Sequence, residues 1–187
     1  MSEPAHDLRM TVPEFLRWDD GTDTRYELVG GRPRAMAPAK DPHGRIAMNA
    51  GVEIDRRLAD RPPCCAISEA GIWISDEDYY EADVAATFAP TSEDGYIAEP
   101  FLVVEVLSAS DARQREGLDK VQDYIALPSV QEIWLIDSRK RRVQQWRRAG
   151  ADTWIVTLPF TGPASFDSPT LGGEPVSLDR LYRNTDL

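Results

Sequence analysis

The spacing of apolar residues along the chain predicts a mixture of helices and strands. Apolar positions four residues apart over residues 45–60, and a second stripe over residues 112–127, predict two amphipathic helices. Residues 101–107 and 131–137 are almost continuously apolar, which is typical of strands that are covered on both faces. Because the second helix separates these two strands, we expect a parallel pair joined by a crossover, and hence an α/β fold.

Shorter signals predict the remaining elements. Thr11 to Glu14 fits a capping box that opens a short helix, and Gly30-Gly31 fits a hairpin turn between two short strands. Residues 36–44 contain two prolines and a glycine and are expected to form a loop. The other predicted elements are strands over 66–75 and 82–88, a hairpin of 142–147 with 153–158, and a helical turn over 177–182. We expect residues 1–10 to form a flexible N-terminal arm and residues 11–187 to form a single domain.

Composition and charge exclude several classes of protein. Of the 187 residues, 21 are Lys or Arg and 32 are Asp or Glu, which gives a net charge of −11 and no overall attraction for a polyanion. No apolar stretch approaches the roughly 20 residues that span a bilayer, and the first ten residues lack the apolar centre of a signal peptide. Cys64 and Cys65 are too few for a zinc quartet or a disulfide framework. We therefore expect a soluble, cytoplasmic protein without a membrane partner.

Two acidic residues lie within apolar strands and are the strongest candidates for chemistry. Glu105 interrupts the run over 101–107, where an ionised carboxylate is costly unless it is paired, hydrogen-bonded or bound to a cation. Asp83 lies near the start of another strand, and the turn-rich segment between them allows the two strands to be antiparallel neighbours. Such a pair would suit Mg²⁺ or Mn²⁺, which prefer oxygen ligands. An ion pair with an arginine, or a position at the strand end, explains Glu105 equally well.

Other polar residues carry weaker signals. Glu27 lies in a short alternating strand, where a solvent-facing glutamate is the usual interpretation. Lys120 lies on the flank of the predicted helix over 112–127, so it can reach a site but is expected to be exposed. His43, in the predicted loop, could be a substrate contact, a general base or an exposed side chain. The basic patch of residues 139–142, followed by Arg147 and Arg148, could hold phosphates, although a charged surface turn is the more usual explanation.

Four segments together resemble the Uma-type family of restriction endonucleases, a bacterial group within the PD-(D/E)XK nuclease superfamily. The segments are Arg25-Tyr26-Glu27-Leu28-Val29-Gly30-Gly31, Ala82-Asp83-Val84, residues 101–110 and residues 119–137. Their order and spacing carry the resemblance, which extends from about Thr11 to Tyr182. The resemblance implies a restriction-endonuclease-like core, in which helices flank a mixed β-sheet and the acidic residues lie at the ends of two adjacent strands.

By matching position, the resemblance also assigns roles to single residues. The implied catalytic residues are Asp83, Glu105 and Lys120, and the implied metal ligands are Asp83, Glu105, Glu27 and the carbonyl of Val106. We also expect His43 and Tyr124 to contact the substrate. Two positions depart from the superfamily pattern. Leu107 stands where the superfamily has its lysine, so Lys120 from the following helix would supply the amine, and Ala82 stands where a proline commonly precedes the Asp.

The expected function is hydrolysis of phosphodiester bonds in DNA by an endonuclease that depends on Mg²⁺ or Mn²⁺. In this interpretation a cation held by Asp83 and Glu105 lowers the pKa of its bound water, and Lys120 stabilises developing charge. DNA is the expected substrate, and the resemblance allows a homodimer. Two alternatives stay open: a catalytically inactive nuclease-like scaffold that binds nucleic acid or a protein partner, and a metal-dependent hydrolase of smaller phosphate esters.

Overall fold

The computed structural model describes all but four short segments, which are 1–7, 38–40, 90–91 and 108–110, and it leaves out the side chains of 111–117. Most of the predicted N-terminal arm is therefore outside the described residues. Where the description begins, the N–H of Met10 donates to the carbonyl of Gly31 at 2.8 Å, which ties this part of the chain to the hairpin turn.

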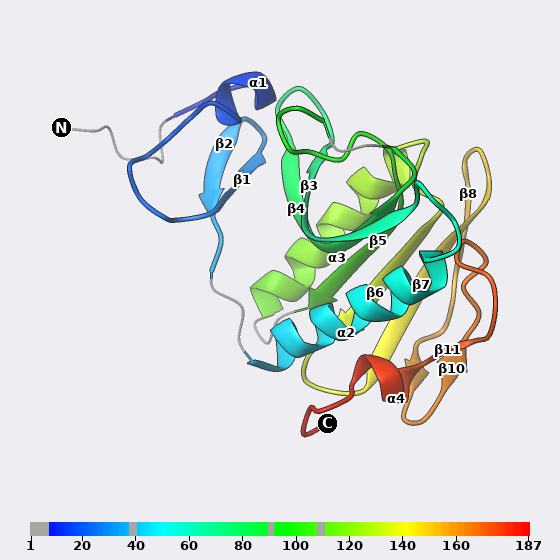
Figure 1. Ribbon diagram of the computed structural model, residues 1–187. Coiled ribbons are helices and arrows are strands. Elements are labelled where there is room, and N and C mark those ends of the chain that lie inside the picture. The colour runs from blue at the N-terminus through cyan, green and yellow to red at the C-terminus, as the bar shows by residue number, and fades with distance from the viewer. Residues whose placement is uncertain (1–7, 38–40, 90–91, 108–110) are drawn as a thin grey trace.

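A mixed sheet forms the centre of the molecule (Figure 1). Its main path has the order β2-β1-β4-β5-β6-β7-β8, with β3 beside β4 and β9 beside β7. The strands are β1 (Tyr26–Val29), β2 (Arg32–Ala35), β3 (Cys65–Trp73), β4 (Tyr79–Thr87), β5 (Pro100–Leu107), β6 (Glu132–Asp137), β7 (Arg142–Gly150), β8 (Thr153–Val156) and β9 (Phe160–Thr161). β5 and β6 are parallel and joined by α3 (Asp111–Ala126), as predicted, whereas the other neighbours are antiparallel.

Helices cover both faces of the sheet. One face packs against α2 (Asp41–Leu58), α4 (Leu178–Leu181) and the small sheet of β10 (Ser165–Phe166) and β11 (Val176–Ser177), and the other packs against α3. Successive side chains of a strand point to opposite faces of the sheet. Val104 and Trp134 therefore face α2, and Val103 and Ile133 face α3. This two-sided burial is the physical reason why β5 and β6 are almost continuously apolar.

The N-terminal elements form a smaller cluster at the edge of the sheet. α1 (Val12–Phe15) packs its apolar residues against Leu28 and Tyr79. The predicted capping box is confirmed, because the N–H of Thr11 donates to the carboxylate of Glu14 at 2.7 Å and the reciprocal bond is also present. This cluster holds β1 against β4, which matters for the site described below.

Several predicted boundaries are wrong, and two of them concern the site. α2 begins at Asp41, inside the segment expected to be a loop, and its first turn carries an ion pair between Asp41 and Arg45 at 2.6 Å. Proline is tolerated in this turn because the first N–H groups of a helix need no intrahelical partner. His43 therefore lies on a helix and not in a loop. β4 begins at Tyr79, earlier than the strand predicted over 82–88.

Candidate active site

Asp83 and Glu105 are brought together by the pairing of β4 with β5. The pairing of β4 with β5 runs as far as Val84 opposite Val104, and Asp83 and Glu105 are the next residues on the two strands. The main chain reinforces this arrangement, because the N–H of Val106 donates to Oδ2 of Asp83 at 2.7 Å. Glu105 is 7% exposed and lies within β5, not at its end. The predicted antiparallel neighbourhood of the two acidic strands is confirmed.

Two side chains from α3 converge on Glu105. Lys120 and Tyr124 are four residues apart and therefore project from the same face of the helix. The hydroxyl of Tyr124 donates to Oε1 of Glu105 at 2.7 Å, and Nζ of Lys120 lies 3.6 Å from the same oxygen. The side chain of Lys120 is only 11% exposed, so the expectation of a solvent-exposed lysine is wrong. Tyr124 is fully buried and supports Glu105, and its predicted contact with substrate stays a prediction.

Glu27 is part of the same group of charges. Its Oε1 accepts a hydrogen bond from Nζ of Lys120 at 2.6 Å and another from the N–H of Glu81 at 2.8 Å. Glu27 is 4% exposed, so its interpretation as a solvent-facing strand residue is wrong. The reason is tertiary: β1 pairs with β4, and the face of β1 that would meet water in an isolated hairpin is covered here by Lys120. The observed role of Glu27 is to hold the ammonium group close to Glu105.

His43 approaches the site from the opposite side. Its Nε2 lies 3.4 Å from Oδ1 of Asp83, and its side chain is 15% exposed. The first turn of α2 thus reaches the carboxylate that β4 presents. The predicted loop position of His43 is wrong, but its proximity to the candidate site is consistent with a role there.

The site holds three carboxylates and one ammonium group within a largely buried volume. Burial raises the pKa of Asp83, against the opposing effects of the Val106 N–H and of Lys120. Burial also raises the pKa of Glu105, with Lys120 opposing the shift and the negative charge of Asp83 adding to it. For Lys120, burial alone would lower the pKa, but Glu105, Glu27 and Asp83 together raise it. Lys120 is therefore a permanent cation, and the carboxylates have an excess of negative charge.

Comparison with known proteins identifies the family. The family model "Uma2: Putative restriction endonuclease" matches residues 12–175. This chain belongs to the Uma2 family. Similar proteins from Synechocystis sp. include the uncharacterized proteins sll1609 and slr1290. The first is 29% identical over 157 residues, which cover 79% of this Uma2 chain and 86% of the relative. The second is 25% identical over 181 residues, which cover 94% and 92%.

A solved structure shares the fold. The crystal structure of a "putative nuclease belonging to DUF820" from Anabaena variabilis superposes with a TM-score of 0.71 and 20% sequence identity, covering 92% of this chain and 97% of the other. At this identity the likeness shows the fold, a mixed sheet flanked by helices, as the sequence predicted. Family membership supports a nuclease function in general. Within the described residues, no helix is both long and apolar enough to cross a membrane.

The side chains of this Uma2 protein fit a divalent cation in their chemistry and charge. Asp83 and Glu105 offer hard carboxylate oxygens from adjacent strands, and burial raises the pKa of both carboxyls although Lys120 opposes the shift. In the part of the chain that the structure describes, no three His, Cys, Asp or Glu side chains form a group able to hold an ion. We therefore expect main-chain oxygen, such as the Val106 carbonyl, to complement the two carboxylates. Glu27 is engaged by Lys120, and its role as a ligand stays a prediction.

The predicted basic patch is largely structural. The guanidinium of Arg148 donates to the carbonyls of Ile125, Leu127 and Val130 and so joins the end of α3 to the sheet. Arg141 pairs with Asp179. These arginines are used in holding the fold together, so the run of basic residues is not a continuous phosphate-binding surface.

The sequence analysis overlooked three buried acids, Glu53, Glu132 and Asp137, of which Glu132 is the most completely buried. Glu132, at the start of β6, is fully buried, and its carboxylate accepts hydrogen bonds from Trp134, Gln145, Ser168 and Thr170. Every donor is neutral, so Glu132 is a structural anchor between β6 and the C-terminal segment. The sequence signal for its burial was an acidic residue at the start of an apolar strand, which is the same kind of signal that identified Glu105 as a candidate.

Proposed function

We propose that this Uma2 protein is a divalent-metal-dependent endonuclease that hydrolyses phosphodiester bonds in DNA. The observation that carries the proposal is that Asp83 and Glu105 lie next to the paired residues Val84 and Val104 of two adjacent strands, with the ammonium group of Lys120 at 3.6 Å from Glu105. Among the described side chains neither acid pairs with an arginine, and two such acids beside a lysine suit metal-assisted phosphoryl transfer. Family membership supports the same general activity.

Each residue of the group has a distinct part in the proposed reaction. Asp83 and Glu105 would hold the cation, which when bound supplies charge stabilisation and a more acidic water molecule. Lys120 stays protonated, so it acts as a hydrogen-bond donor and a fixed positive charge next to the phosphate, not as a proton acceptor. Glu27 and Tyr124 position Lys120 and Glu105 respectively.

The test is cleavage of DNA by purified protein. Supercoiled plasmid and labelled oligonucleotides are incubated with Mg²⁺, with Mn²⁺ and with EDTA, and the products are separated on gels. We expect cleavage only with a divalent ion, and we expect Glu105→Gln and Asp83→Asn each to reduce the rate by about 10²-fold or more. Glu93→Gln, a change of the same type at an exposed acid, is the matched control for the acid-to-amide substitution and should cut like the wild type, whereas contaminating nuclease would give equal cleavage in Glu105→Gln.

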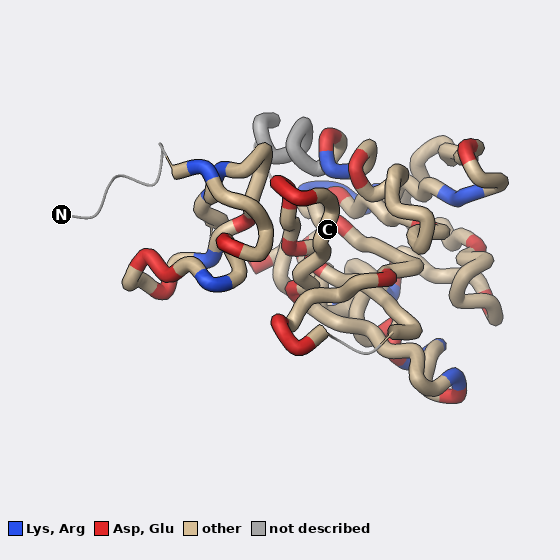
Figure 2. The backbone as a smooth tube through the Cα atoms, turned by 90° about the horizontal axis from the view of Figure 1, so that it is seen from above, with Lys and Arg blue, Asp and Glu red and all other residues tan. Residues whose placement is uncertain are grey.

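Inactivity of the wild type on every DNA form with both ions would overturn the proposal, as would equal cleavage by Glu105→Gln. A binding scaffold that does not cut is the second candidate. It is favoured by the shorter contact of Lys120, which lies 2.6 Å from Glu27 and 3.6 Å from Glu105. Acidic residues also occur along most of the chain, which weakens general attraction for DNA (Figure 2). DNA binding that Asp83→Asn and EDTA leave unchanged, without cleavage, would establish the scaffold.

A further inference from the structure

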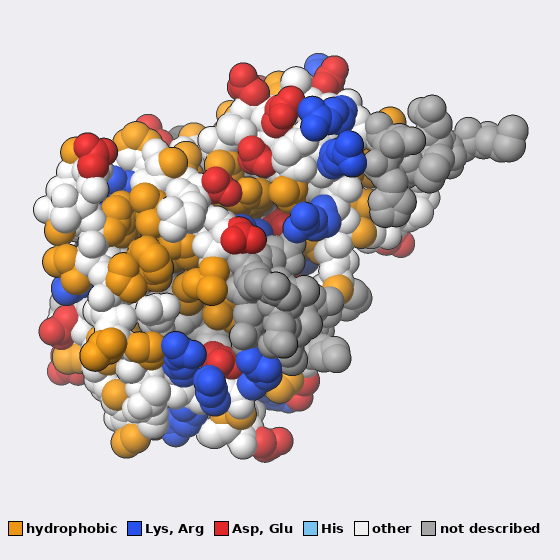
Figure 3. Space-filling model, turned by 180° about the vertical axis from the view of Figure 1, so that it is seen from behind, with side chains coloured by type: hydrophobic (Ala, Val, Ile, Leu, Met, Phe, Trp, Pro, Cys, Tyr) orange, Lys and Arg blue, Asp and Glu red, His pale blue; other side chains and the backbone are white. Residues whose placement is uncertain are grey.

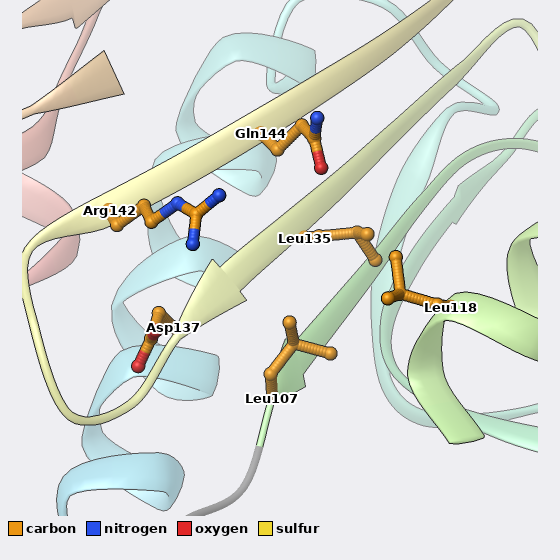
Figure 4. Close-up of a pocket in the computed structure, with 6 residues that line it drawn as sticks. All are labelled: Leu107, Leu118, Leu135, Asp137, Arg142 and Gln144. Carbon is orange, nitrogen blue, oxygen red and sulfur yellow. The ribbon is translucent and has the colours of Figure 1, made fainter. Parts of the chain in front are cut away.

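A recess lies on the α3 side of the sheet, next to the candidate active site. Figure 4 shows it: three leucines gather at the side near α3, and β7 supplies two polar side chains opposite them. The lining residues are Leu107, Leu118, Leu135, Asp137, Arg142 and Gln144. Leu118 is 45% exposed although it projects from the helix toward these apolar neighbours. An apolar floor with a few polar groups is typical of a small-ligand site.

The register of the sheet places this recess beside Glu105. Glu105 lies opposite Leu135 on β6, and Leu135 in turn lies opposite Gln144 on β7. With neighbouring strands about 4.8 Å apart, Gln144 is about 10 Å from Glu105 across the sheet. Leu107 follows Glu105 by two residues and therefore projects from the same face. The recess is thus a continuation of the candidate site along the sheet.

The polar groups of the recess are suited to an anion and a hydrogen-bonding ring. In the described part of the chain, the only hydrogen bonds of Arg142 involve its main chain, and its guanidinium is turned toward the recess in Figure 4. The carboxylate of Asp137 does not neutralise it, because it accepts from the N–H of Arg139 at 2.8 Å and points away from Arg142 in the same view. Among the described residues, the amide of Gln144 makes one long contact, 3.5 Å, to the carbonyl of Thr157.

We propose that this recess binds one unpaired nucleotide of the substrate strand, with its base against the leucines and Gln144 and its phosphate on Arg142. The inference rests on the proposed nuclease function and specifies its substrate as single-stranded or locally unpaired DNA. A base that is stacked and paired in a duplex cannot reach an apolar floor, and the duplex backbone offers only sugar and phosphate to three leucines. On the back of the molecule, hydrophobic side chains gather next to a group of Lys and Arg side chains (Figure 3), a combination that suits an unpaired strand.

Binding is measured by fluorescence anisotropy with a labelled oligonucleotide, as a single strand and as the matching duplex. The protein carries Glu105→Gln in Mg²⁺, so the measurement does not depend on turnover. We expect tighter binding of the single strand. Adding Arg142→Ala should weaken single-strand binding about tenfold and reduce the slope of log K against log salt concentration by about 0.7, the value for one lost phosphate contact. Adding Leu118→Ala should weaken single-strand binding about fivefold at an unchanged salt slope and leave duplex binding unaffected.

Two substitutions serve as matched controls. Arg183→Ala removes an exposed arginine beyond α4, and Met48→Ala removes an exposed apolar side chain of α2 that is 71% exposed; both should bind like the parent protein. Equal affinity for both DNA forms, or wild-type affinity and salt slope in Arg142→Ala, would overturn the recess as a nucleotide site even if the wild type cleaves DNA. Absence of cleavage with the expected binding pattern would instead remove the nuclease function and leave the recess as a binding site.

Discussion

Burial of Asp83 and Glu105 predicts an unusual pH dependence of stability in metal-free buffer. Burial raises the pKa of both carboxyls above their ordinary values of 3.8 and 4.5. Between the ordinary and the raised pKa the folded protein binds more protons than the unfolded chain, so the free energy of unfolding falls as the pH rises. The stabilisation is therefore complete below the ordinary pKa and is lost as the pH passes through the raised pKa. Glu53 has the opposite effect because its pKa is lowered: its contribution makes the free energy of unfolding rise with pH, and it does so only below the ordinary pKa of 4.5.

The size of the effect follows from proton counting. One carboxyl that is protonated in the folded state and ionised in the unfolded state lowers the free energy of unfolding by about 1.4 kcal/mol per pH unit. Asp83 and Glu105 interact, so their protons leave in two steps that belong to the pair. Glu105→Gln removes one proton-binding group, so the fall in the free energy of unfolding with pH should become less steep by up to about 1.4 kcal/mol per pH unit between the ordinary and the raised pKa of Glu105. The substitution also relieves the repulsion on Asp83, which reduces the pH dependence further. Glu81, whose pKa burial also raises, contributes equally to both proteins.

The assay is urea denaturation followed by tryptophan fluorescence, in EDTA, at closely spaced pH values from about 5 to about 8. The wild type, Glu105→Gln and the exposed-site control Glu93→Gln are compared at each pH. We expect the variant to gain stability relative to the wild type as the pH rises, and the control to run parallel to the wild type. Parallel curves for the wild type and Glu105→Gln would refute the reasoning. Glu105 would then bind no more protons in the folded protein than in the unfolded chain.

Three further predictions test the same physical account. Mg²⁺ or Mn²⁺ should raise the Tm of the wild type at pH 8 in a concentration-dependent way and should leave the Tm of Asp83→Asn unchanged; an equal rise in both proteins would place the ion elsewhere. Tyr124→Phe removes the hydroxyl that donates to Glu105 at 2.7 Å and should cost about 2 kcal/mol at pH 8 and less at pH 5, where Glu105 is protonated; an equal loss at both pH values would contradict a bond to the carboxylate. Glu132→Gln places an NH₂ group against donors and should cost about 3 kcal/mol by urea denaturation, with unchanged DNA cleavage per folded molecule.

Much of the sheet could be predicted from sequence because its signals are local. The apolar runs of β5 and β6 require cover on both faces, and a helix between them supplies it on one side, so the parallel pair follows. The turn-rich segment between two strands allowed Asp83 and Glu105 to lie on antiparallel neighbours, and the structure confirms that these strands pair. The start of α2 was mispredicted because a proline and a glycine close to it favour a loop, although a first helical turn accepts proline.

The partners of Lys120 could not be predicted in the same way. Lys120 and Glu27 are 93 residues apart, and their contact exists because β1 pairs with β4 while α3 crosses the same face of the sheet. Helical periodicity places Lys120 only on the flank of the buried stripe, and strand alternation places Glu27 on a face whose cover is unknown until the fold is assembled. Burial of a charged group is a tertiary property, so local patterns assigned both residues to solvent.

The position of Lys120 on α3 allows an apolar residue to stand two positions after Glu105 on β5. By the resemblance described for the sequence, a lysine is expected two residues after Glu105; this chain has Leu107 there, and Leu107 lines the recess next to the candidate site. An ammonium group there would put a second positive charge close to Arg142 and would remove part of the apolar floor. With the amine supplied from the helix and fixed by Glu27 at 2.6 Å, the strand is free to present an apolar side chain beside the acids. Leu107→Lys should accordingly weaken the preference for single-stranded over duplex DNA in the anisotropy measurement, by adding sequence-independent phosphate attraction and removing an apolar contact to the base. An unchanged preference would show that an apolar side chain at position 107 does not contribute to the discrimination between single-stranded and duplex DNA.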